Sequence, residues 1–204
     1  MTSKFRALTH GAVAMAALGI AVGACAQSSQ SSLAGEIAGP KAGKIFIDLS
    51  VGKSTYHTSC GDVAGLTCSR GTTSYSLTAG NMITDNVGIE LSAMNLGKAD
   101  RAGGSVIARG VNLSAVARLP LGDVFGVEAK VGPTYGVTHV NTAADSGLGS
   151  GRAHGFGLGY GVALDVNVTR GIHGSVGWEQ HDFKFAGQGR SNVRNVTLAL
   201  GYTF

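Results

Sequence analysis

Three residues that together could carry out nucleophilic catalysis lie close together near the C-terminus: His173, Ser175 and Glu179. A histidine can accept the proton of a serine hydroxyl, and a carboxylate can orient that histidine, so such a set could perform acyl transfer. All three occupy odd positions in a segment where apolar and polar residues alternate, which predicts that they share one face of a strand. His173 also follows directly after a short predicted turn, at the rim of that strand. The arrangement is therefore a weak candidate for an active site.

The glycines do not form a phosphate-binding loop. Neither G-x-G-x-x-G nor G-x-x-x-x-G-K-[ST] occurs in register with a strand and a helix, so we expect no nucleotide and no other cofactor. Instead, Gly155, Gly157, Gly159 and Gly161 repeat with the period of a strand. This spacing indicates a wall against which other groups pack tightly.

The N-terminus has the features of a secretory signal. Lys4 and Arg6 precede an uncharged apolar run at 11–24, and Ala24-Cys25-Ala26 is a small-x-small cleavage site. The run is too short to span a bilayer as a helix. We predict a signal peptide at 1–26, a flexible lead-in at 27–43 and the folded domain at 44–204. Cleavage removes two cations and no acid, which lowers the formal charge from +4 to +2. This weak surplus does not favour a nucleic-acid partner.

The cysteines follow from the predicted export. Cys25 has an alternative interpretation as an acylated lipoprotein cysteine, although ordinary cleavage is favoured. Cys60 and Cys68 would then be the remaining thiols in an oxidising compartment. We expect them to form a disulfide that stabilises a short loop by about 2–3 kcal/mol. A metal site is the weaker alternative, since His57 is the single further ligand nearby.

From residue 44 onward, apolar residues recur at every second position. One face of each segment is almost free of charge, whereas the other carries Gly, Ala, Ser and single charges. A soluble ligand-binding barrel would show the reverse, with a hydrophobic lumen and a charged exterior. The pattern predicts an all-β fold: an eight-stranded antiparallel up-and-down transmembrane β-barrel with a polar lumen. The segments that show the alternation lie at 45–52, 73–80, 89–94, 111–119, 125–132, 156–165, 172–181 and 195–204.

The predicted connections alternate in length, as in outer-membrane barrels with short periplasmic turns and longer outer loops. Short links are predicted at 83–86, 120–123 and 167–171, and longer hydrophilic loops at 54–72, 97–103, 138–152 and 184–192. The chain ends in Tyr202 and Phe204, which share the apolar face of the last segment. We interpret these two residues as a signal for the outer-membrane barrel-assembly machinery, which would recognise them by strand addition.

Four segments resemble the OmpA-like transmembrane domain of small outer-membrane β-barrel proteins. They are G-I-E-L-S-A-M-N-L-G at 88–97, V-N-L-S-A-V-A-R-L-P-L-G-D at 111–123, V-E-A-K-V-G at 127–132 and T-L-A-L-G-Y-T-F at 197–204. The resemblance extends from about residue 44 to residue 204. It implies that the charges inside the lumen form a packed network rather than a catalytic set. By position, these residues are Asp48, Glu90, Arg118, Glu128, Lys130, Asp165, His173, Glu179 and His181.

Five carboxylates in this set face two fixed cations. A charge in a narrow lumen is costly unless it is paired, so we expect Glu90 or Glu128 to pair with Lys130 or Arg118. Water or protonation would balance the remaining acids.

The sequence leaves three functions open. We favour a structural or surface-interaction role without catalysis, in which outer loops mediate envelope integrity or adhesion. The alternative is a narrow passive pore for small solutes, although eight strands leave little room inside. The third is a lipid-modifying enzyme, because His173, Ser175 and Glu179 resemble the set of outer-membrane lipid A deacylases. The expected surroundings are outer-membrane lipid and lipopolysaccharide, and the extracellular partner is unknown.

Overall fold

The computed structural model describes residues 42–58, 69–101, 103–143 and 149–204. The predicted signal peptide and Cys25, Cys60 and Cys68 lie outside these residues, as does the predicted disulfide. Within them, no helix is long and apolar enough to cross a membrane. The strands are β1 (Ile45–Tyr56), β2 (Gly71–Met82), β3 (Val87–Arg101), β4 (Gly104–Leu121), β5 (Phe125–Asn141), β6 (Gly151–Asn167), β7 (Ile172–Phe185) and β8 (Gly189–Thr203).

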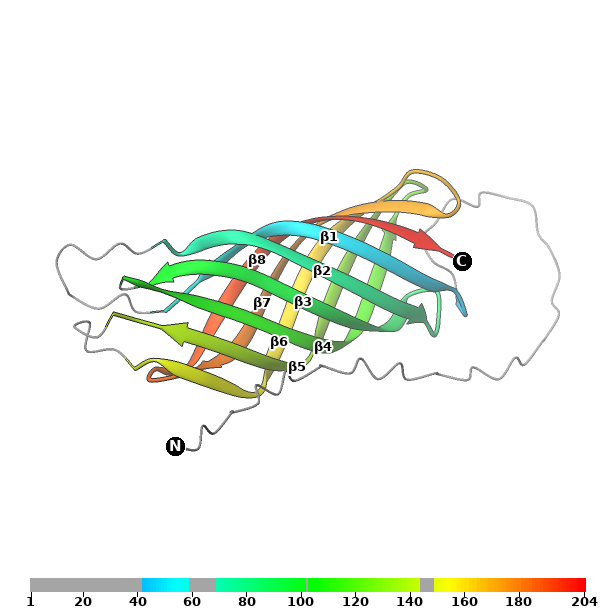
Figure 1. The fold of residues 1–204 in the computed structure, drawn as a ribbon. Helices are drawn as coiled ribbons and strands as arrows, with labels where there is room; N and C mark the ends of the chain where they lie inside the picture. Colours follow the sequence, from blue (N-terminus) through cyan, green and yellow to red (C-terminus); the bar gives the residue numbers. More distant parts are fainter. Residues whose placement is uncertain (1–41, 59–68, 102, 144–148) are drawn as a thin grey trace, which may run out of the picture. The chain divides into compact units, whose positions relative to one another are not determined.

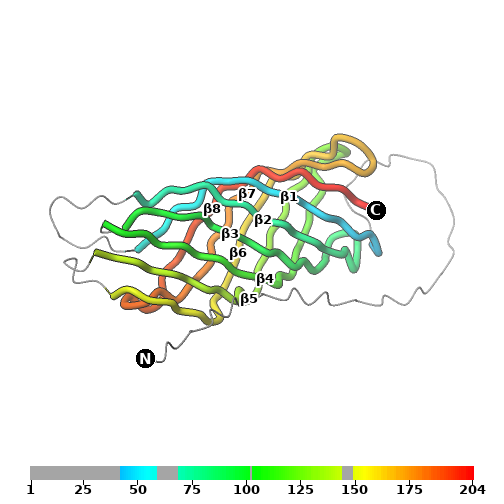
Figure 2. Tube along the Cα trace, viewed as in Figure 1, coloured from blue at the N-terminus to red at the C-terminus, as the bar shows by residue number. Residues whose placement is uncertain are grey.

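The eight strands form one closed antiparallel barrel in which each strand pairs with its neighbours in sequence (Figure 1). The first and last strands, β1 and β8, pair from Phe46↔Thr203 to Tyr56↔Val193 and close the barrel (Figure 2). The backbone N–H of Phe204 extends this seam by donating to the carbonyl of Ile45 at 2.9 Å. Closure leaves no strand edge exposed, which is what a sheet in a bilayer requires. The predicted fold class is confirmed.

Tight turns join the strands at the end of the barrel where the described chain begins and ends. Two of these turns are held by threonine hydroxyls: Thr84 accepts from the N–H of Val87 at 2.9 Å, and Thr169 accepts from that of Ile172 at 3.1 Å. Threonine is suited to this role because its hydroxyl can replace a backbone acceptor within a turn. The short links predicted at this end are therefore present.

The connections at the opposite end differ from the prediction. The β1–β2 and β5–β6 connections are long. In contrast, only residues 102–103 separate the end of β3 from the start of β4, and only residues 186–188 separate β7 from β8. The loops predicted at 97–103 and 184–192 are thus largely strand. Polar outward residues suggested loops there, whereas the backbone continues the sheet. With 18 residues in β4 and 17 in β5 and β6, these strands exceed the roughly 9–11 residues that span a bilayer.

Successive side chains alternate between the exterior and the lumen. Leu49, Leu77, Leu119, Leu164 and Leu200 are exposed on the outer surface, as expected for a lipid-facing band. The alternation breaks once, at a bulge between Asn95 and Lys98 where Gly97 has a φ of +77°. A side chain at Gly97 would meet the carbonyl of Thr73 at 2.2 Å, so the bulge needs glycine. Beyond it, the inward position on β3 shifts from even to odd residues.

The lumen has two parts of different chemistry. Its half near the short turns carries the nine predicted charged and histidine residues, with Phe46, Met82 and Val116 buried beside them. Its half near the long loops holds a hydrophobic cluster and one further buried cation, Arg101. This corrects the prediction of a lumen that is polar throughout. The cluster is formed by residues at the ends of the strands nearest the long loops: Tyr56, Met94, Leu96, Ala99, Val106, Ala108, Val140, Phe183, Phe185 and Val193.

Candidate functional site

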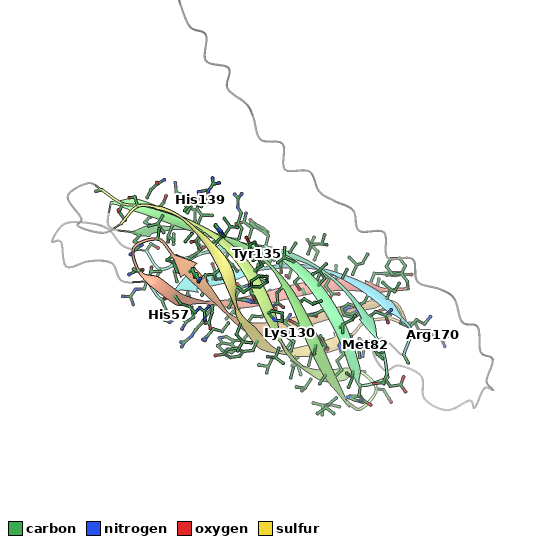
Figure 3. The ribbon with its side chains drawn as sticks, turned by 90° about the horizontal axis from the view of Figure 1, so that it is seen from below. His57, Met82, Lys130, Tyr135, His139 and Arg170 are labelled. Atoms are coloured by element: carbon green, nitrogen blue, oxygen red, sulfur yellow. The ribbon has the colours of Figure 1, made fainter. Side chains whose placement is uncertain are left out.

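Lys130 is one centre of a charge network inside the barrel. Its Nζ lies 2.6 Å from Oε1 of Glu179 and 3.0 Å from Oε1 of Glu90. These three residues come from β5, β7 and β3, so the contacts connect strands that are not neighbours in the sheet. Figure 3 shows Lys130 midway between residues at the two ends of the barrel. One cation thus ties together three walls of the lumen.

Arg118 is the second centre. Its Nη2 lies 2.6 Å from Oε2 of Glu128, its Nε donates to the same oxygen at 2.7 Å, and Nε lies 3.3 Å from Oδ2 of Asp165. The guanidinium also lies 4.8 Å from the centre of the Phe46 ring, a cation–π geometry. A planar guanidinium suits this position because it can serve two carboxylates and a ring face at once.

Two histidines contact the carboxylates of the set. His173 Nε2 lies 2.7 Å from Oδ1 of Asp48, and His181 Nε2 lies 3.2 Å from Oε2 of Glu179. The Nδ1 of His181 is 3.1 Å from the Thr134 hydroxyl. Each of the nine predicted lumen residues therefore contacts another member of the set. The expected pairings took a definite form: Glu90 contacts Lys130, and Glu128 contacts Arg118.

The network leaves little free space. The cavity among these side chains measures about 30 Å³, room for one or two water molecules. Glycines in the wall allow this density, because the atoms of lumen side chains lie where a Cβ would be. A Cβ on Gly80 would be 2.2 Å from Phe46, and one on Gly201 would be 1.8 Å from Asp48.

The hydrophobic cluster fills the lumen between the network and the long loops. Tyr56 organises it: its hydroxyl donates to the carbonyl of Gly97 at 2.8 Å and accepts from the N–H of Ala108 at 3.0 Å. The Tyr56 ring packs edge to face against Phe185, with centroids 6.3 Å apart. A Cβ on Gly136 would be 2.1 Å from the Phe183 ring, so that ring lies directly on the wall. Sequence reasoning missed this cluster.

The suspected catalytic set is not assembled. The two ring nitrogens of His173 face Asp48, at 2.7 Å, and the hydroxyl of Thr203, at 3.5 Å, rather than Ser175. Glu179 contacts Lys130 and His181. Among the residues that the structure describes, no group of three or more His, Cys, Asp or Glu side chains could hold a metal ion. His173 and Glu179 thus belong to the network of ion pairs through Asp48 and Lys130.

The exterior shows a charge pattern that the sequence reasoning also missed. Above the lipid-facing band, toward the long loops, the outward positions are rich in exposed cations, and His139 in Figure 3 marks this level on β5. Two acids, Asp100 and Asp182, share this level. We call these cations the basic collar: Lys53, Lys98, Arg109, Arg152, Lys184, Arg190 and Arg194. The signal available in the sequence was that Lys53, Arg109 and Arg194 each take the next outward position beside the apolar run of their strand.

Aromatic side chains lie at both borders of the band. Tyr135 and Phe156 pack edge to face near the collar, with ring centroids 5.1 Å apart. At the other border, Tyr202 and Phe204, the predicted assembly signal, are exposed on the exterior with centroids 5.0 Å apart. Aromatic girdles at both lipid–water boundaries are characteristic of outer-membrane barrels.

A closed eight-stranded barrel with an apolar exterior and a packed lumen defines the class of small outer-membrane barrels. The sequence matches the outer membrane protein beta-barrel domain over residues 12–204, and the chain belongs to this family. Its location is therefore the outer membrane. No curated protein matches the sequence.

Solved structures share the fold at low sequence identity. Neisserial surface protein A is 12% identical with a TM-score of 0.60, covering 79% of this chain and 99% of its own. OprG from Pseudomonas aeruginosa is 18% identical with a TM-score of 0.59, covering 83% and 99%. Ail, the attachment invasion locus protein of Yersinia pestis, is 16% identical with a TM-score of 0.54, covering 80% and 99%.

Proposed function

We propose that this protein is a closed membrane anchor that presents the long-loop end of its barrel for surface interactions, and that it neither conducts solutes nor catalyses a reaction. The observation that carries the proposal is the double filling of the lumen. The charge network leaves a cavity of about 30 Å³, and the hydrophobic cluster lies between this network and the long loops. A solute would have to displace ion pairs and then cross an apolar layer.

The strand lengths support the surface role. β4, β5 and β6 continue well past the lipid-facing band on the long-loop side, so part of the sheet itself lies beyond the bilayer. An apolar cluster inside this part stiffens it, since buried side chains resist local opening. Just beyond the ends of β5 and β6, hydrogen bonds between Thr142 and Ser150 connect the two sides of the β5–β6 connection. A rigid platform of this kind suits a binding surface.

A structural neighbour with the same fold supports the surface role. Ail is by name an attachment protein, and it has also been crystallised with a heparin analogue, sucrose octasulfate.

Solute entry into liposomes tests the proposal. We expect liposomes that contain the folded protein to swell in arabinose no faster than protein-free liposomes. A Phe183→Ala/Phe185→Ala double variant thins the apolar layer, and Phe156→Ala is a matched control on the exterior. Swelling by the wild-type protein, at a rate that depends on solute size, would replace the anchor with a pore.

A further inference from the structure

One sector of the basic collar concentrates cations at the border of the lipid-facing band. Lys184 on β7 and Arg190 on β8 are direct cross-strand partners, and both are exposed on the exterior. Like charges placed opposite each other on a sheet repel and destabilise the pair. An anion bound between them would remove this repulsion.

Two hydrogen bonds fix the arginines of this sector. Arg190 reaches across β7, and its Nη2 donates to the carbonyl of Phe156 at 2.9 Å. Arg194 Nε donates to Oε1 of Gln180 at 3.0 Å, and Gln180 Nε2 donates to the Tyr160 hydroxyl at 2.7 Å. Held at Nε, the Arg194 guanidinium keeps its two Nη groups available as donors. Fixed guanidinium groups are well suited to phosphate oxygens.

The position of this sector relative to the lipid-facing band bears on which anion could bind here. Val196, the next outward residue after Arg194 on β8, belongs to the lipid-facing band, and Phe156 belongs to the aromatic border. The cations therefore lie where lipid headgroups begin. Three cations against one acid, Asp182, leave a formal charge of +2 on this face.

The two ends of the barrel differ in charge. Among the described residues next to the short turns, the exposed charges are balanced, with Lys44 and Arg170 against Asp85 and Asp123. The excess of cations is confined to the long-loop end, which faces the outer leaflet in this class of barrel.

We propose that Lys184, Arg190 and Arg194 form a binding site for the phosphate groups of lipopolysaccharide in the outer leaflet. The lipid acyl chains would lie along the band beside Trp178 and Tyr160, whose rings pack 6.0 Å apart. The site goes beyond the proposed anchor function and does not depend on a closed lumen.

Tryptophan fluorescence of the folded full chain in zwitterionic micelles tests this site, because Trp178 is the single tryptophan and lies two residues from Gln180. The probe is lipid A with its phosphates, compared with lipid A from which the phosphates have been removed. We expect saturable binding of the phosphorylated form alone, and weaker binding as salt increases.

The matched variants are Arg190→Gln/Arg194→Gln in the site and Lys44→Gln/Arg170→Gln at the opposite end. We expect the first pair to raise Kd about 30-fold, roughly a factor of five for each lost cation, and the second to leave it unchanged. Arg194→Lys, which keeps the charge, should retain most of the affinity. A heat-dependent shift in gel mobility verifies that each variant is folded.

Three results would overturn the site. They are equal Kd values for the two double variants, equal binding of lipid A with and without phosphate, and binding of a soluble sulfated glycan without binding of lipid A.

Discussion

The ammonium of Lys130 lies 2.6 Å from the carboxylate of Glu179 and connects β5 to β7 across the lumen. Strands that are not neighbours share no backbone hydrogen bonds, so this contact and that of Lys130 with Glu90 on β3 brace the barrel from within. The hydrogen-bonded sheet closes the barrel, and the network fixes its cross-section.

Lys130→Met should lower the free energy of unfolding by about 3–5 kcal/mol, because it leaves two buried carboxylates without their cation. Urea titration in lipid vesicles measures this change. Lys53→Met, on the exterior, is the control and should change stability by less than about 0.5 kcal/mol. If the two variants unfold at the same urea concentration, the network does not brace the barrel.

Gly201→Ala should also destabilise the barrel, because its Cβ would lie 1.8 Å from Asp48 and 2.4 Å from His173. Relieving this overlap requires the Asp48–His173 pair to move, at a cost of about 1–3 kcal/mol. Gly174→Ala is the matched control, since its Cβ would meet the carbonyl of Ala199 at an ordinary 3.6 Å. The two variants are compared by the temperature to which a sample must be heated before its folded band disappears from the gel. Equal temperatures would show that the lumen wall is not tightly packed at Gly201.

The direction of the barrel in the membrane can be tested with epitope insertions. An epitope after Gln188, in the β7–β8 turn, should bind antibody on intact cells. An epitope after Asp123, in the β4–β5 turn, should bind only after the outer membrane is permeabilised. The reverse pattern would place the basic collar at the periplasmic face and remove the argument for lipopolysaccharide.

The strand period predicted the sheet and the inward residues with little ambiguity. Because side chains alternate faces, Glu90 and Glu128 could be assigned to the lumen from their positions between exposed Leu91, Ala129 and similar neighbours. Individual contacts could not be assigned. That Lys130 reaches Glu179 rather than Glu128 depends on the tilt of β5 against β7 across the lumen, which no local pattern encodes.

Sequence reasoning missed the hydrophobic cluster at the long-loop end of the lumen for a different reason. Phe183 and Phe185 lie beyond 172–181, the segment predicted as a strand, although β7 continues through them. Polar residues on the outer face, such as Lys184, made this part of the sequence resemble a loop. Outside the bilayer the exterior becomes polar, so an apolar lumen reverses the pattern that identifies a membrane strand. The bulge at Gly97 further shifted Ala99 to the inward face.

Current across a planar lipid bilayer tests the filled lumen most directly. With the folded wild-type protein inserted, we predict no stepwise conductance, because a solute would have to pass both the charge network and the hydrophobic cluster. Stable, reproducible conductance steps from properly folded protein would contradict the closed lumen and with it the proposed anchor function.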